Sequence, residues 1–134
     1  MDCIFCKIVA GEIPSYKVYE DEDILAFLDV APINPGHTLV IPKKHYANLL
    51  ELPEDLLCKV ALAIKKIIPA ILKGVGTEDF NLNLNSGSLA GQVVNHVHWH
   101  IVPRFEGDGY DLWLGKAYGE GEAEKVAEKI KNSL

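Results

Sequence analysis

The alternation of apolar and polar residues along the chain predicts five short β-strands. A strand is expected where side chains alternate in polarity, or where a short apolar run ends at a turn residue or a proline. The predicted strands span residues 16–20, 24–29, 38–41, 80–84 and 97–102. Pro42 and Pro103 are expected to end the third and the fifth strand. Because the strands are short and joined by turn-rich loops, they favour an antiparallel sheet.

A longer period predicts one main helix at residues 53–73. Its apolar positions recur every three or four residues and form one wide face. That face comprises Leu56, Leu57, Val60, Ala61, Ile64, Ile67, Ile68, Ile71 and Leu72. Pro53 suits a first helical turn, whereas Pro69 is expected to kink the helix or to end its regular part. Gly74 and Gly76 should then stop the helix.

Two short helices are predicted near the ends of the chain. One spans residues 4–10 and is stopped by Gly11. The other spans residues 122–131, and it starts acidic and ends basic, as the helix dipole favours. Its apolar residues are expected to face inward, and they are Ala123, Val126, Ala127 and Ile130. Residues 106–121 are rich in glycine and irregular. These elements together predict an α+β fold, with the long helix packed on one face of the sheet.

Composition indicates a single soluble globular domain. The chain has 134 residues, of which 49% are hydrophobic and 24% charged, and a core of this size does not split. The 13 Lys and Arg residues against 19 Asp and Glu residues give a net charge of −6, which argues against a broad nucleic-acid groove. A small phosphate ligand remains possible, because a few polar groups can hold it against the overall charge.

Neither a membrane segment nor a signal peptide is expected. The most apolar stretch, residues 56–72, is interrupted by lysines and by Pro69, so it does not suit a bilayer. The N-terminus lacks the basic and apolar regions of a secretory signal. We therefore expect a cytoplasmic location. In that reducing compartment the 3 cysteines argue against a disulfide framework.

A cluster of histidines carries the strongest chemical signal. Side chains alternate along a strand, so His96, His98 and His100 should share one face while apolar residues occupy the other. Neighbouring members would lie about 6.7 Å apart at Cα, so two of them can share a zinc ion but three in a flat strand cannot. At least one imidazole is left for other chemistry. His98 is the natural nucleophile or base, because it has a polar partner on each side.

A glycine-rich loop leads directly into the histidine segment. Such a loop can bring backbone N–H groups and amide side chains to a phosphate beside His98. Loop and histidines together give the pattern Asn85-x-Gly-x-x-x-Gly91-Gln92-Val93-x-x-His-x-His-x-His-x-x-Pro-Arg. This pattern resembles the histidine-triad (HIT) superfamily of nucleotide hydrolases and transferases. Residues 25–29 and 34–45 look like the other segment that this superfamily shares.

The resemblance covers about residues 3–104 and is closest to the Hint-like branch. It implies a five-stranded antiparallel sheet with one long helix, usually in a dimer, which agrees with the elements predicted above. Residues 105–134 would then be a C-terminal extension of a single HIT-like domain that spans residues 1–134. The transferase branch carries Gln at the third triad position, so His100 favours hydrolysis.

The resemblance also implies roles for individual residues. His98 would attack the α-phosphorus of a nucleotide and form a phosphohistidine that water then cleaves. His100, Gln92 and Asn85 would hold the α-phosphate, with Gly91 in the same loop, and His37 would line the polar layer behind the site. Asp29 would accept hydrogen bonds from the ribose hydroxyls. The residues that would flank the base are Ile4, Ile8, Phe27 and Val30.

Val93 departs from the family pattern. The position after the Gly-Gln pair is commonly Ser or Thr, whose hydroxyl can pass a proton to the leaving group. Valine cannot do so, and the proton would have to come from His37, from water or from the substrate. High phosphoramidase activity is therefore in question.

Two cysteines near the N-terminus, Cys3 and Cys6, form a second candidate site. Their spacing alone is compatible with a redox pair, half of a metal site or chance. In the family members that carry this pair, the positions of His45 and His96 complete a structural zinc site. The resemblance therefore implies one zinc ion that offers no open position for catalysis. Cys58, on the apolar face of the long helix, is expected to be buried.

The leading functional prediction is a hydrolase that cleaves nucleoside 5′-monophosphates from an amine or another small leaving group, with purines favoured. One alternative is a dinucleoside polyphosphate hydrolase of the same superfamily. The other is a nucleotide-binding interaction protein that does not catalyse; Val93 favours it and the intact triad opposes it. A homodimer is the only protein partner implied.

Overall fold

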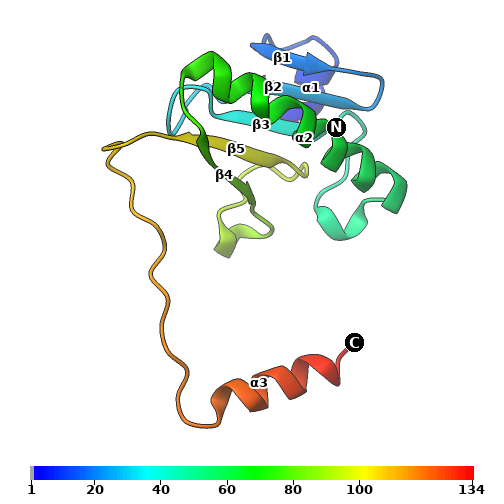
Figure 1. The fold of residues 1–134 in the computed structure, drawn as a ribbon. Helices are drawn as coiled ribbons and strands as arrows, with labels where there is room; N and C mark the ends of the chain where they lie inside the picture. Colours follow the sequence, from blue (N-terminus) through cyan, green and yellow to red (C-terminus); the bar gives the residue numbers. More distant parts are fainter. Residues whose placement is uncertain (1) are drawn as a thin grey trace.

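The computed structural model describes residues 2–134, in which five strands form the predicted antiparallel sheet (Figure 1). Their spatial order is β1-β2-β3-β5-β4, so β1 and β4 are the edge strands. The strands are β1 (Lys17–Glu20), β2 (Ile24–Leu28), β3 (Thr38–Pro42), β4 (Asp79–Leu84) and β5 (Trp99–Arg104). The predicted α+β fold with one long helix is confirmed.

Helices cover both faces of the sheet, and each face has its own apolar core. The long helix α2 (Glu54–Val75) packs on one face, and the short helix α1 (Ile4–Val9) packs on the other. Strand β2 shows why both cores form: Ala26 points toward α2, whereas Phe27 points toward α1. Such a strand is buried on both sides, and it therefore reads as a continuous apolar run rather than an alternating one.

Helix α2 is longer than its sequence predicts. Pro53 is its N-cap, and the left-handed Gly76 (φ 81°) is its C-cap, as expected for a glycine at this position. Gly74 lies inside the helix, so the expectation that it helps to stop the helix is wrong. The regular helix also continues through Pro69 as far as Val75. Pro69 is exposed, so water can solvate the carbonyl that loses its partner there.

The buried face of α2 is narrower than the apolar pattern suggests. Val60, Ile64, Ile67 and Ile71 are buried as predicted, and so is Ala63, which the pattern did not include. Other members of the predicted face point to solvent, because the sheet contacts only one side of the helix; the exposed residues are Leu57 and Ala61. Cys58 is exposed too, so the expectation of a buried thiol is wrong.

Strand β5 starts two residues later than predicted and runs past its proline. Pro103 lies opposite Phe80 of β4, beyond Ile101, where the pairing with β3 ends. A proline is tolerated there because β3 no longer needs a donor from β5. The carbonyl of Pro103 accepts a hydrogen bond from the Asn34 side chain instead, at 2.9 Å.

The C-terminal helix α3 (Glu122–Lys131) lies apart from the sheet, at the end of an extended arm (Figure 1). All ten of its residues are described, and none is buried. The expectation that its apolar residues face inward is therefore wrong for this chain by itself. Two short 3₁₀ turns, Leu49–Glu51 and Ser88–Ala90, complete the elements. Within the described residues no helix is long and apolar enough to cross a membrane.

Candidate functional site

The three clustered histidines point away from α2, to the sheet face on which α1 packs. The intervening Val97 and Trp99 are buried in the core under α2, so the predicted alternation holds. His100 lies opposite Leu39 of β3, which belongs to the core under α1. His96 and His98 come before the first residue of β5, so they lie in the segment that enters the strand and not in the strand itself. That irregular entry lets the three imidazoles separate into different environments.

A hydrogen bond to the backbone fixes the orientation of the His98 ring. Its Nδ1 lies 2.7 Å from the carbonyl oxygen of His96, so Nδ1–H donates and Nε2 keeps a free lone pair. The edge of the Phe5 ring packs against the imidazole at 5.1 Å between ring centroids. His98 is buried, and it lines the pocket described below.

A chain of hydrogen bonds determines the tautomers of His37 and His100. The backbone N–H of Ile33 donates to Nδ1 of His37 at 3.0 Å, so the proton of His37 lies on Nε2. That Nε2–H donates to Nδ1 of His100 at 2.9 Å. His100 therefore carries its own proton on Nε2, as a donor that remains available to a ligand.

Burial keeps these two imidazoles neutral at pH 7. Desolvation lowers the pKa of His37, although the Asp29 carboxylate, 3.7 Å away, partly opposes this effect. The pKa of His100 is lowered to about 4, chiefly by desolvation and also by the neighbouring His98 and His37, while Asp29 opposes the shift. Both residues thus act as hydrogen-bonding groups and not as cations near neutral pH.

A pocket of about 320 Å³ opens in front of His98 and His100. It is mostly apolar with a few polar groups, which is typical of small-ligand sites. The predicted site residues that line it are Ile4, Ile8, Phe27, Asp29, Val30, Gly91, His98 and His100. Ile4 and Val30 are 47% and 85% exposed, so they form the rim and add little to the core.

Sequence reasoning missed several apolar residues of this pocket. Phe5, Ile13 and Val94 line it as well. A signal for Phe5 was present, because Phe5 and Ile8 are three residues apart on the same short helix. Ile13 and Val94 come from loops, where no periodicity marks the side that faces a ligand.

Gln92 organises the glycine-rich loop. Its side-chain oxygen accepts from the backbone N–H of Gly87 at 2.9 Å. Its amide nitrogen donates to the carbonyl of Ala47 at 2.8 Å and to that of Val94 at 3.0 Å. Both amide donors are therefore engaged with the backbone, and Gln92 has none left for a phosphate in this conformation. Asn85 lies outside the pocket in a neighbouring hollow, close to Gly91.

A second cluster brings together Cys3, Cys6, His45 and His96, whose ligand atoms all lie within 4.8 Å of one another. The Nδ1 of His96 is 3.5 Å from the Cys3 sulfur, and the Nδ1 of His45 is 3.4 Å from the Cys6 sulfur. A tetrahedral zinc ion with ordinary bond lengths separates a bound sulfur and nitrogen by about 3.6 Å. These residues could therefore hold a metal ion.

The orientation of His96 also fits metal binding. Its Nε2–H donates to the carbonyl of Pro42 at 2.7 Å, which leaves Nδ1 as the nitrogen that faces the sulfurs. A backbone acceptor on the far ring nitrogen is how proteins orient a metal-binding histidine. The cluster joins α1, the segment after β3 and the entry to β5.

Comparison with known proteins agrees with this geometry. A HIT-like protein of Methanocaldococcus jannaschii, described as uncharacterised, is 50% identical over 96% of this chain and 98% of its own length. The adenosine 5′-monophosphoramidase hnt1 of Schizosaccharomyces pombe is 41% identical over 98% of this chain and all of its own length. The adenylylsulfatase HINT3 of Arabidopsis thaliana is 47% identical over 87% of this chain, which covers 58% of that protein.

Solved structures share the whole fold. A HIT-family protein of Bacillus subtilis superposes with a TM-score of 0.91 at 42% identity, over 100% of this chain and 98% of the other. A zinc-bound histidine-triad protein of Mycobacterium smegmatis superposes with a TM-score of 0.78 at 34% identity, over 100% and 99%. The HIT domain matches residues 10–107. Taken with the histidine site and its nearby pocket, this shows that the chain belongs to the HIT family of nucleotide-binding and nucleotide-hydrolysing proteins.

Proposed function

We propose that this protein hydrolyses purine nucleoside 5′-monophosphate derivatives at the α-phosphate, with phosphoramidates as the best substrates. The observation that carries the proposal is the pairing of a nucleophilic nitrogen with a donor in one pocket. In the neutral tautomers that the hydrogen bonds assign, Nε2 of His98 has a lone pair and Nε2 of the adjacent His100 carries a hydrogen. The two rings lie 4.9 Å apart at their centroids. Relatives named as phosphoramidases favour this substrate class over others.

The proposed reaction has two displacements at phosphorus. Nε2 of His98 forms a bond to the α-phosphorus, and the amine leaves with the electron pair of the broken P–N bond. Water then attacks the same phosphorus, the bond to Nε2 breaks, and its electron pair returns to the imidazole. His100 donates to a non-bridging phosphate oxygen in both steps, and His37 holds it in the tautomer that can do so.

The departing amine needs a proton, and Val93 has none to give. Val93 lines the pocket and is exposed, so its side chain lies where a hydroxyl could have acted. We assign protonation of the leaving group to water that enters through this open rim. His37 is a poor candidate, because its Nε2–H is already directed at His100.

Substrate binding uses the remaining lining of the pocket. The Oδ1 of Asp29 accepts from the backbone N–H of Ala31 at 2.9 Å, and its second carboxylate oxygen is the acceptor that we assign to the ribose hydroxyls. Ile4 and Val30 at the rim, with Ile8 and Phe27 deeper, would sandwich a planar base. Gln92 is a positioning residue that shapes the phosphate loop, and Asn85 supports the same loop through Gly91.

We further propose that the second cluster binds one structural zinc ion. Two thiolates and two imidazoles saturate a tetrahedral ion, so it supplies a cross-link between distant segments and no reactive position. The donor set and the spacing of its atoms support zinc, and so does the zinc-bound relative.

A homodimer is proposed as well. Among residues 2–134, no strand pairs with the outer side of edge strand β4, and its Phe80 and Leu82 are partly exposed apolar residues. Natural monomers usually protect such an edge. A second copy that adds its own β4 would cover it.

Turnover of adenosine 5′-phosphoramidate by the full-length protein tests the catalytic proposal. His98→Ala should retain less than a few per cent of the wild-type kcat, while its Kd for AMP stays within roughly tenfold, because a nucleophile contributes mainly to the chemical step. Cys58→Ser is the matched control and should match the wild type. Faster hydrolysis of diadenosine tetraphosphate would favour the dinucleoside polyphosphate hydrolase. Tight AMP binding without turnover of either substrate would favour a nucleotide-binding protein that does not catalyse.

A further inference from the structure

Helix α3 presents an apolar stripe that none of the described residues buries. Its members follow the i, i+3, i+4, i+7 spacing of a packed helix face, and they are Ala123, Val126, Ala127 and Ile130. All of α3 lies within the described residues, yet none of it is buried, and Ile130 is 59% exposed. A helix of ten residues is marginal in water by itself. Its stability therefore requires a surface outside the helix.

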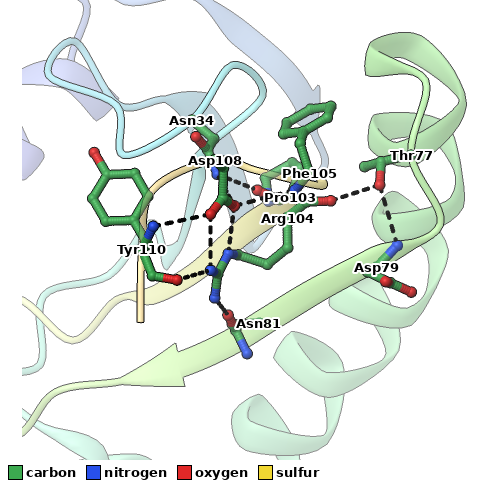
Figure 2. A network of polar contacts seen from close by, with 9 residues as sticks. All are labelled: Asn34, Thr77, Asp79, Asn81, Pro103, Arg104, Phe105, Asp108 and Tyr110. Carbon is green, nitrogen blue, oxygen red and sulfur yellow. Dashed lines mark hydrogen bonds and ion pairs between the residues drawn. The ribbon is translucent and has the colours of Figure 1, made fainter. Parts of the chain in front are cut away.

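The arm that carries α3 leaves the sheet in a defined direction. Arg104, at the end of β5, forms a two-pronged ion pair with Asp108, at 2.8 and 3.1 Å (Figure 2). Asn34 donates to the same carboxylate at 3.0 Å, and the Arg104 guanidinium also donates to the carbonyl of Tyr110 at 2.7 Å. The ion pair and the surrounding N–H donors hold the pKa of Asp108 well below its ordinary value. This clamp fixes residues 105–110 against the sheet.

Beyond the clamp, the arm passes the β4 edge and runs away from the domain (Figure 1). It carries large exposed side chains that a solitary chain would not be expected to display together. These residues are Leu112, Trp113, Leu114 and Tyr118, with Trp113 98% exposed. The arm and α3 therefore present one continuous apolar surface on the β4 side of the molecule.

An apolar groove lies at the opposite edge of the sheet. Four gaps between five strands span about 19 Å, whereas one helix is about 10 Å wide, so α2 leaves part of the sheet uncovered. The groove has a volume of about 450 Å³ and lies between β1 and the second half of α2. The small residues Gly36, Ala70 and Gly74 line the groove. Val18 and Leu28 add apolar surface to it.

We infer that α3 of one copy of this chain docks in the β1–α2 groove of a second copy, and that the second copy reciprocates. The groove of the same chain lies beside β1, while its α3 leaves past β4. A twofold axis at the β4 edge, as in the proposed homodimer, places the partner's groove on the side where α3 lies. Lys66 lines the groove and complements the acidic first turn of α3. The exchange is reciprocal, as a twofold interface requires.

Cross-linking between two differently marked copies tests this exchange directly. In a Cys58→Ser background, Ala127→Cys is placed in one full-length chain and Ala70→Cys in another. A short bismaleimide added to the equimolar mixture should yield a covalent dimer that contains one chain of each kind. Lys125→Cys, on the opposite side of α3, is the matched control and should give several-fold less. The background protein without added cysteines reports any reaction of Cys3 and Cys6.

Three outcomes would overturn the inference. One is a cross-linked monomer from a chain that carries both new cysteines, with no dimer from the mixture, because α3 would then dock in its own chain. Another is equal cross-linking by Ala127→Cys and Lys125→Cys. The third is a monomeric protein by light scattering at the concentration used. The inference rests on the proposed homodimer and not on the proposed catalysis. The activity of His98→Ala therefore neither supports nor contradicts the docking of α3.

Discussion

At the scale of single residues, hydrogen bonds to the backbone decide which histidine nitrogen can react. The carbonyl of His96 takes the Nδ1 proton of His98, and the N–H of Ile33 forces the proton of His37 onto Nε2. Because Nε2–H of His37 donates to Nδ1 of His100, the proton of His100 lies on Nε2. Without these hydrogen bonds, each of the four neighbouring imidazoles could carry its proton on either ring nitrogen. The fold places them in different environments, which suit the proposed roles of metal ligand, nucleophile, donor and residue that orients the donor.

The depressed pKa of His100 gives a pH dependence of stability with a definite sign. Burial lowers the pKa of His100 to about 4 in the folded protein, whereas an unfolded chain titrates near pH 6.5. The unfolded state therefore binds more protons between these values, and the free energy of unfolding should fall as the pH drops from about 6.5 to about 4. His100→Gln should reduce this slope. Urea unfolding of both zinc-saturated proteins across that range measures the difference, and parallel curves would contradict the assignment.

Val93 provides a second test at this scale. If water protonates the leaving group only because a hydroxyl is missing, Val93→Ser should raise kcat more for basic amine leaving groups than for acidic ones. Val93→Thr should act in the same direction, while Val93→Ala controls for the change in size. Steady-state rates on a series of adenosine phosphoramidates give the comparison. An equal effect on all leaving groups would exclude proton transfer as the reason.

At the scale of elements, the sequence pattern predicts the strands well because their signals are local. Alternation, turn residues and capping residues act within a few positions, and the observed strands start and end within two residues of expectation. The errors come from contacts beyond the element. Strand β5 continues through Pro103 because β3 has stopped pairing, and the faces of α2 that lie off the sheet expose Leu57 and Cys58.

We expect helix α1 to depend on the proposed zinc site more than on its own length. Six residues cannot hold a helix in water, and a zinc ion would tie its Cys3 and Cys6 to two distant segments. We expect a chelator to lower the Tm by roughly 10 °C, which corresponds to a few kcal/mol, before activity is affected directly. Calorimetry with and without added zinc, with metal analysis, measures this. Cys58→Ser should keep both the zinc and the Tm of the wild type.

A different result would remove the structural role of the metal. Protein with intact thiols, no zinc and a Tm that does not change when zinc is added would show that the cluster is an unused remnant. Loss of turnover at an unchanged Tm would instead place the metal in the chemistry, contrary to its saturated ligand set.

At the scale of the whole molecule, the resemblance to the HIT superfamily predicts the fold, and the family match confirms it. The pocket residues that the resemblance names converge in the structure, with two qualifications. Gln92 directs its amide to the loop backbone, and Asn85 lies outside the pocket. The orientation of Gln92 does not follow from spacing along the chain, because it depends on where the segment around Ala47 meets the loop.

The order of strands and helices, the alternation of the histidine segment between two faces and the amphipathic stripe of α3 could all be predicted from the sequence, because each is a periodicity within a few residues. The folded chain sets which nitrogen of His96 faces the sulfurs, which nitrogen of His98 is free and whether α3 packs inward. These outcomes depend on groups far apart along the chain. Burial and hydrogen-bond partners are properties of the assembled surfaces, and no local pattern encodes them.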